Sequence, residues 1–173
     1  MAYRIVISGP ESTGKTALAI FLSKKLHGRL IPEYARNYVS NLDRPYSFKD
    51  VEHIARWQKE RYHAVKSSER IVVIDTWLII TRVWFEVVFH KVPHWINAEL
   101  RENKPDLFLL CYPDIDWQPD PVRENGGKMR FILYDKYESL FKQHAYPYEV
   151  IKGIGEDRSN NALKAIKKRL NIS

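Results

Sequence analysis

Cysteine is almost absent from this 173-residue chain, since Cys111 is the only one. A single cysteine cannot form an intramolecular disulfide, which excludes the class of small secreted domains stapled by disulfides. Long apolar runs are missing as well, and runs such as residues 77–80 fall far below the ~20 residues that a membrane-spanning helix needs. The N-terminus has no pattern of a secretory signal. We therefore expect a cytoplasmic protein without a membrane partner.

Internal repeats, low-complexity tracts and Gly/Ser linkers are also lacking, so we expect one domain over residues 1–173. The six histidines show no metal-ligand spacing, which makes a structural zinc site improbable. The net charge of +7 suits an anionic ligand such as ATP, and it would also suit nucleic acid. Because no nucleic-acid recognition motif accompanies the charge, nucleic acid is not the expected partner.

Short apolar runs alternate with helix-like stretches along the whole chain. Helices are predicted from Lys15 to a stop at Gly28, from the capping-box pattern that starts at Ser47, over 131–141, and from Ser159. The runs read as strands at residues 3–8, 30–31, 71–74, 107–111 and 149–151. This alternation predicts an α/β protein: a P-loop NTPase three-layer fold with a five-stranded parallel sheet flanked by helices.

The segment GPESTGKT at residues 9–16 lies between the first predicted strand and the first predicted helix. It matches the P-loop pattern GxxxxGK[ST], in which backbone N–H groups surround a polyphosphate and the helix adds its positive end. Lys15 is expected to reach the β- and γ-phosphates of ATP, and the Thr16 hydroxyl to bind Mg²⁺. The residues expected to contact the nucleotide are Gly9, Pro10, Glu11, Ser12, Thr13, Gly14, Lys15, Thr16 and Ala17.

Two carboxylates follow predicted strands and are candidates for chemistry. Asp75 comes after the apolar run 71–74, where P-loop proteins place a carboxylate beside the metal; an N-cap role for the next helix is the alternative. Glu33 follows the second strand and would project into the crevice at the carboxyl edge of the sheet. Either residue could accept the proton of a substrate hydroxyl, although Glu33 could instead form a surface salt bridge with Arg36.

The segment of about residues 112–130 is rich in Asp, Pro and Gly, and we interpret it as a lid between strands 4 and 5. Arg123 and Arg130 flank its Gly-Gly turn, and closure of the lid could bring their guanidinium groups onto the transferring phosphate. Pairing of these arginines with Asp120 or Glu124 is the alternative.

Aromatic residues near these motifs could supply flat surfaces for a substrate ring. Aromatic residues at helical spacing more often belong to the core, and that alternative stays open for all of them. Trp77 is the preferred candidate for a ring contact, because it directly follows the pair Asp75-Thr76 at the mouth of the predicted site. The candidates are Trp77, Trp84, Phe89, Tyr34 and Tyr38.

The order GPESTGKT, EYAR, VVIDT and DWQPDPVR, with a later arginine, resembles the ribosylnicotinamide kinase domain of NadR-type proteins, which are P-loop kinases. The likeness covers nearly the whole chain. The positions that match the family are Lys15, Thr16, Glu33, Tyr34, Arg36, Asp75, Thr76, Trp117, Asp120, Arg123 and Arg130. Of these, we expect substrate contacts by Glu33, Tyr34, Arg36, Trp117 and Asp120, and catalytic roles for Lys15, Glu33, Asp75, Arg123 and Arg130. The nucleotidyltransferase domain that usually precedes this kinase shows no signature before Tyr3, so adenylyl transfer is not expected.

Two positions depart from the family pattern. Trp77 stands where such kinases have a second Asp, and Pro32 stands where the family can carry an aromatic residue before Glu-Tyr. A cationic pyridinium favours acidic and aromatic walls, so both changes alter the predicted acceptor pocket. Trp77 would restore a stacking surface.

These observations predict an ATP- and Mg²⁺-dependent kinase that phosphorylates a hydroxyl of a small nucleoside-like substrate, with ribosylnicotinamide as one candidate. A regulatory module that binds ATP with little or no transfer is the alternative. The identity of the acceptor and the oligomeric state are left open.

Overall fold

The five strands form one parallel sheet, as expected. In the computed structural model, which describes residues 2–119, 121 and 124–172, the strand that precedes the P-loop lies at the centre of the sheet. The strand order is β2-β3-β1-β4-β5, with β1 (Tyr3–Ser8), β2 (Arg29–Ile31), β3 (Ile71–Asp75), β4 (Leu107–Cys111) and β5 (Tyr148–Ile151). The α/β fold with a five-stranded parallel sheet is thereby confirmed.

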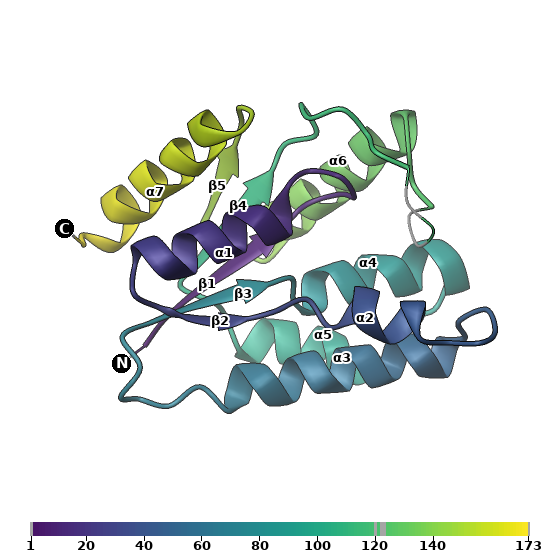
Figure 1. The fold of residues 1–173 in the computed structure, drawn as a ribbon. Helices are drawn as coiled ribbons and strands as arrows, with labels where there is room; N and C mark the ends of the chain where they lie inside the picture. Colours follow the sequence, from purple (N-terminus) through teal and green to yellow (C-terminus); the bar gives the residue numbers. More distant parts are fainter. Residues whose placement is uncertain (1, 120, 122–123, 173) are drawn as a thin grey trace.

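Helices cover both faces of the sheet (Figure 1). They are α1 (Lys15–Lys25), α2 (Ala35–Ser40), α3 (Phe48–His63), α4 (Leu78–Phe89), α5 (His94–Glu102), α6 (Lys128–Gln143) and α7 (Glu156–Leu170). Helices α1 and α7 pack on one face, and α3, α4, α5 and α6 pack on the other. No helix in the described part of the chain is long and apolar enough to cross a membrane.

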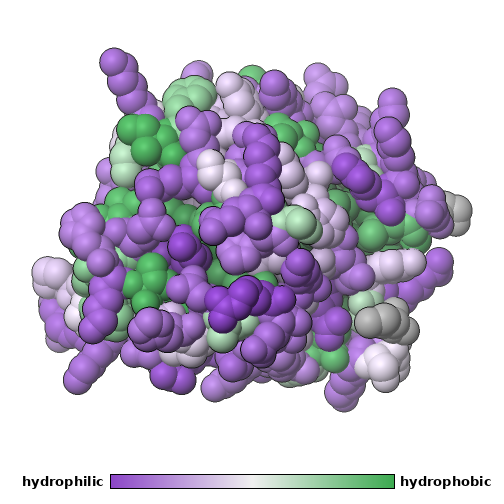
Figure 2. All heavy atoms as spheres, turned by 180° about the vertical axis from the view of Figure 1, so that it is seen from behind, coloured by the Kyte–Doolittle hydropathy of each residue, from purple (hydrophilic) through white to green (hydrophobic). Residues whose placement is uncertain are grey.

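Alternating side chains of the central strand supply both apolar cores. Ile5 and Ile7 point to the α1/α7 face, while Val6 between them points to the opposite face. All three are fully buried, as expected for a strand covered on both sides. The larger core holds most of the buried aromatic rings. The face drawn in Figure 2 carries mainly hydrophilic side chains, with apolar ones in scattered patches.

The strands direct the predicted site residues to one edge of the sheet. Ile7 of β1 pairs with Asp75 of β3, so the end of β3 lies beside the start of the P-loop. Ile31 of β2 pairs with Ile74, which brings Glu33 to the same edge. In parallel α/β sheets, ligands bind outside this carboxyl edge.

Several boundaries differ from those that the sequence predicts. Helix α7 begins at Glu156 rather than near Ser159, and α2 and α5 lack a clear sequence signal. Gly28 is not the left-handed residue after α1, because that conformation belongs to His27, with φ 49°. A Cβ on Gly28 would lie 2.9 Å from the carbonyl oxygen of Ile71, so close contact with β3 requires the glycine.

Candidate active site

The P-loop turns tightly between β1 and α1. Gly9 has φ 141°, and a Cβ at this position would lie 2.8 Å from the carbonyl oxygen of Cys111 in β4. Glycine is therefore required both by its backbone conformation and by the close approach of the neighbouring strand. The loop then leads directly into α1 at Lys15, so the loop residues and the positively polarised start of the helix line one cavity.

Lys15 and Thr16 line this cavity at the P-loop, and Asp75 contacts Thr16 from the end of β3. The Lys15 ammonium donates to the carbonyl oxygen of Pro10 at 2.7 Å, so the side chain folds back over the loop. The Thr16 hydroxyl donates to Oδ2 of Asp75 at 2.7 Å. Oδ1 of Asp75 is buried and has no hydrogen-bond partner among the described residues. Burial raises the pKa of Asp75, while Thr16 and Lys15 oppose that shift.

Glu33 lines the same cavity, close to these groups. Burial raises the pKa of Glu33, and the nearby Asp75 and Glu11 carboxylates act in the same direction. Lys15 lowers the pKa in opposition. A partly buried carboxylate with a raised pKa beside a phosphate-binding lysine has the character of a general base.

The cavity has a volume of about 470 Å³ and extends from the P-loop into a largely apolar region. Helix α4 supplies one wall, with Ile80, Val83, Trp84 and Val87, while Tyr46 lines the cavity with its ring 4.9 Å from that of Trp84. The remaining apolar and aromatic lining comes from α2 and α6, as Val39, Leu133 and Tyr137. Such a concave apolar site with a few polar groups is typical of a small-molecule pocket.

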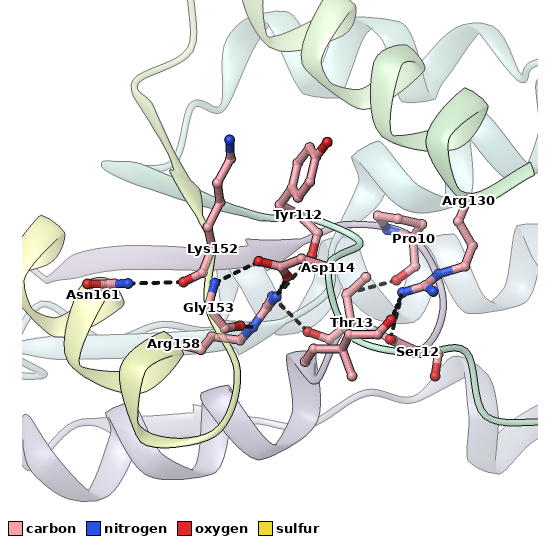
Figure 3. A network of polar contacts seen from close by, with 11 residues as sticks. Pro10, Ser12, Thr13, Tyr112, Asp114, Arg130, Lys152, Gly153, Arg158 and Asn161 are labelled. Carbon is pink, nitrogen blue, oxygen red and sulfur yellow. Dashed lines mark hydrogen bonds and ion pairs between the residues drawn. The ribbon is translucent and has the colours of Figure 1, made fainter. Parts of the chain in front are cut away.

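Two buried arginines donate hydrogen bonds to backbone carbonyl oxygens of the P-loop (Figure 3). Arg158 of α7 donates to the carbonyl oxygen of Thr13 at 3.0 Å and pairs with Asp114. Arg130 of α6 donates to the carbonyl oxygens of Ser12 at 3.0 Å and Ile115 at 2.7 Å. Because these bonds fix two consecutive peptide groups, they restrict how the loop presents its N–H groups to a phosphate.

The segment after β4 lies against the P-loop through two of the loop's side chains. The Glu11 carboxylate accepts hydrogen bonds from the backbone N–H groups of Glu124 at 3.1 Å and Asn125 at 2.9 Å. The Ser12 hydroxyl accepts one from the N–H of Gln118 at 2.9 Å. In this structure, Gln118, Glu124 and Asn125 of the predicted lid therefore contact the P-loop.

Comparison with known families agrees with this geometry. The model of the AAA domain family AAA_28 matches residues 4–158, which is most of the chain. The chain belongs to this AAA domain family. The trifunctional NAD biosynthesis/regulator protein NadR of Salmonella typhimurium is 26% identical over 130 residues, covering 72% of this chain and 32% of that protein. The NadR of Escherichia coli matches equally. The chain thus spans about a third of the length of these curated relatives.

Solved structures show the same fold as this AAA domain. A NadR protein in complex with NR superposes with a TM-score of 0.85 at 20% identity, over 99% of this chain and 52% of that one. Thymidylate kinase from Ehrlichia chaffeensis has a TM-score of 0.66 at 15% identity, over 96% and 98% of the two chains. Deoxyadenosine kinase from M. mycoides with bound dATP has a TM-score of 0.63 at 17% identity, over 98% of this chain and 100% of that one. These likenesses establish a P-loop kinase fold.

Several predicted residues of the AAA domain lie together at the cavity. The lining includes Gly9, Glu11, Ser12, Thr13, Gly14, Lys15, Thr16, Ala17, Glu33 and Arg36. Pro10 contributes its carbonyl oxygen to Lys15. The nucleotide-contacting and metal-binding roles of these residues stay predictions.

The expectation that Trp77 offers a ring to the substrate is wrong for this structure. Trp77 is fully buried and stacks on Tyr62, with ring centroids 4.4 Å apart. Its side chain enters the core because the chain turns at Thr76, with φ 68°, before α4 begins. Phe89 likewise packs on Phe48 and is not part of the cavity lining.

Three further predicted residues lie away from the cavity lining. Tyr34 stacks on Trp57 at 4.4 Å, and its hydroxyl lies 3.0 Å from Nε2 of His53. Trp117 packs against Gly126 in a separate shallow hollow. Arg130 is 5% exposed and does not line the cavity; its guanidinium donates to the carbonyl oxygens of Ser12 and Ile115, and its catalytic role stays a prediction. Asp120 and Arg123 lie outside the described residues.

Sequence reasoning missed most of the acceptor side of the cavity. Gln58 is a polar residue on the otherwise apolar face of α3, which was an available signal. Thr81 lies on α4, soon after Asp75, but a helix of mostly apolar residues gives no sign of which face is lined by a cavity. Trp84, one turn further along α4, was among the aromatic candidates and does line the cavity. Arg158 had no signal, because its partners are distant in sequence.

Proposed function

We propose that this AAA domain is an ATP- and Mg²⁺-dependent kinase that transfers the γ-phosphate to a hydroxyl of a small nucleoside-like molecule. The observation that carries the proposal is one continuous cavity that holds the P-loop, Glu33 and an apolar wall with an aromatic ring. A donor phosphate and an acceptor ring would thus lie in one enclosure, with a carboxylate among the residues that line it.

The phosphate end suits a nucleoside triphosphate. The loop N–H groups and the N-terminus of α1 would surround the β- and γ-phosphates, and Lys15 would exchange its bond to Pro10 for the phosphate oxygens. The unpartnered Oδ1 of Asp75, next to the Thr16 hydroxyl, fits a hard cation that prefers oxygen ligands. When bound, Mg²⁺ would neutralise charge on the phosphate oxygens.

The proposed transfer needs one proton acceptor. The acceptor hydroxyl oxygen forms a bond to the γ-phosphorus, the bond from that phosphorus to the β,γ-bridging oxygen breaks, and ADP leaves. The proton of the hydroxyl passes to the Glu33 carboxylate, whose raised pKa makes it a better base than an exposed glutamate. The Lys15 ammonium stabilises the charge that develops on the phosphate oxygens.

The acceptor end suits a flat ring attached to a sugar. Trp84 and Tyr46 replace Trp77 as the aromatic surface, since both line the cavity. The similarity to NadR proteins, one of them solved with NR, supports ribosylnicotinamide as a candidate acceptor. The similarity to deoxyadenosine kinase supports nucleosides as the other candidates.

A coupled assay of ADP release tests the proposal. Purified protein with ATP and Mg²⁺ is expected to show turnover that depends on added ribosylnicotinamide or nucleoside. ATP binding without turnover by any acceptor would contradict the proposal and would favour a regulatory module that binds ATP. A binding experiment with a nonhydrolysable ATP analogue verifies that the protein used is active.

A further inference from the structure

A buried polar pair lies in the apolar part of the cavity. Gln58 of α3 and Thr81 of α4 both line the cavity, and their exposed fractions are 4% and 0%. The Thr81 hydroxyl donates to Oε1 of Gln58 at 3.0 Å. Glu33 is the proposed proton acceptor, so the transfer described above uses neither of these two residues.

Among the described residues, the side-chain amide of Gln58 has a hydrogen-bond partner for its oxygen but none for its nitrogen. Its oxygen accepts from Thr81, whereas its Nε2 donates no hydrogen bond among the described residues. Nε2 is not one of the fully buried side-chain atoms of the described residues that lack a partner, so it remains accessible from the cavity that Gln58 lines and can donate to a ligand there. With its oxygen held by Thr81, the amide presents N–H groups to whatever occupies that cavity.

The surroundings make this amide selective. Ile80, Val83 and Leu133 offer shape and apolar contact, and their aliphatic side chains form no hydrogen bonds. In such a wall, an amide donor discriminates between a ligand that carries an acceptor and one that lacks it, because the second displaces water from the donor and leaves it unpaired. Gln58 is thus placed to read the edge of a ring rather than the sugar hydroxyl that is phosphorylated.

We propose that Gln58 is a specificity-determining residue whose Nε2 donates to an acceptor atom on the planar base of the substrate. The inference rests on the proposed kinase function. The substrate class is a riboside whose base carries a carbonyl oxygen or a ring nitrogen at its edge. The carboxamide of ribosylnicotinamide and the edge of a nucleobase are two sources of that same chemistry.

Thr81 is a positioning residue for this contact. Its hydroxyl lies 3.1 Å from the carbonyl oxygen of Leu78 as well as 3.0 Å from the Gln58 oxygen. When the hydroxyl donates to Gln58, Nε2 faces the ligand; without the hydroxyl, the amide is free to rotate and present either end. Loss of Thr81 should therefore weaken selectivity, and Thr81→Ser should restore it because serine keeps the hydroxyl.

Kinetics on a matched pair of acceptors tests the proposal. Ribosylnicotinamide and ribosylpyridinium differ only in the carboxamide, and adenosine and cytidine represent nucleobase edges. In Gln58→Leu, kcat/KM for the preferred acceptor is expected to fall about 10- to 100-fold. In the same variant, kcat/KM for ribosylpyridinium should stay within about twofold of the wild-type value. In Thr81→Val, the ratio of kcat/KM for the preferred acceptor to that for ribosylpyridinium should fall about 3- to 10-fold, and in Thr81→Ser this ratio should return to the wild-type value.

The control is Gln143→Leu, the same substitution on an exposed residue at the end of α6 that does not line the cavity. It should leave every value unchanged. A loss in Gln58→Leu on ribosylnicotinamide but not on nucleosides assigns the carboxamide as the partner, and the reverse assigns a nucleobase. An equal loss on all four acceptors, ribosylpyridinium included, would overturn the proposal.

Failure of the kinase function gives a different result. If the wild type shows no turnover, calorimetry in the presence of a nonhydrolysable ATP analogue measures binding of the same four compounds. Weaker binding of the carbonyl- or nitrogen-bearing compounds in Gln58→Leu, with ribosylpyridinium unaffected, would retain the recognition role. If Gln58→Leu binds all four compounds as the wild type does, or the wild type binds none of them, the proposal is wrong.

Discussion

The two ends of the cavity are built in different ways. The phosphate end comes mainly from one continuous segment, residues 9–17, and uses backbone groups and the start of a helix. The acceptor end is assembled from single side chains on α2, α3, α4 and α6, which are distant in sequence. For the proposed kinase, a local motif therefore defines the site of the phosphate donor, whereas tertiary packing defines the site of the acceptor.

The largest effect is expected from a substitution at the phosphate end of the cavity. Lys15→Ala should lower kcat/KM for ATP by at least about 100-fold, because it removes the P-loop ammonium that is expected to stabilise the charge on the phosphate oxygens. ADP release measures the rate, and equilibrium binding measures the affinity. Lys25→Ala, on the exposed last turn of α1, is the matched control and should behave as wild type. Unchanged ATP kinetics in Lys15→Ala would contradict the donor site.

The next effect tests the junction between the two ends. Glu33→Gln should reduce kcat about 100-fold or more while ATP still binds, because only the proton acceptor is lost. Burial raises the pKa of Glu33 above that of an exposed glutamate. Because the base must be ionised to accept a proton, the wild-type rate should fall as the pH drops through this raised pKa. A pH–rate profile checks this, and the acidic limb should disappear in Glu33→Gln. An acidic limb retained in the variant would assign it to another group.

Arg158 provides a more selective test of the phosphate end. Arg158→Gln should raise the KM for ATP about 10-fold and leave the KM for the acceptor unchanged, because it releases the Thr13 carbonyl without touching the acceptor wall. Steady-state kinetics at varied ATP gives the measurement. Arg169→Gln, on the same helix but with a half-exposed side chain paired with Glu149, is the control. Equal increases in both KM values would indicate a general loss of structure instead.

The smallest expected effect separates two tryptophans at the acceptor end. Trp84→Leu should raise the acceptor KM about 5- to 10-fold with little change for ATP, because a stacking surface of about 1 kcal/mol is lost. Trp77→Leu should instead lower the free energy of unfolding by about 2 kcal/mol or more and spare the acceptor KM, since Trp77 lies in the core. Thermal unfolding and acceptor kinetics together distinguish the two, and a reversed pattern would contradict the assignment.

The phosphate end and the sheet could be predicted from sequence because their signals are local. Lys15 and Thr16 belong to a motif with fixed spacing, and the apolar run that ends at Asp75 predicts a buried parallel strand. The strand ends then converge through the topology of a parallel sheet, which also places Glu33.

The acceptor end was predicted less well, because orientation within a helix or turn depends on packing. Trp77 and Trp84 are both aromatic residues close to Asp75, and only the left-handed turn at Thr76 sends one into the core. Arg130 carried the charge expected of a catalytic arginine, yet the carbonyls that it meets belong to segments separated from it by 15 and 118 residues. No short-range pattern encodes such contacts.

The bond between Arg158 and Thr13 has a consequence for the order in which the protein becomes competent during synthesis. The two residues are 145 positions apart, so the ribosome completes the phosphate-binding motif long before the arginine that supports it is made. Such long-range contacts form late, after the loop-closure entropy of the intervening chain has been overcome. A nascent chain would thus carry the whole motif and still lack a fully supported nucleotide site until the last helix emerges and packs beside the first.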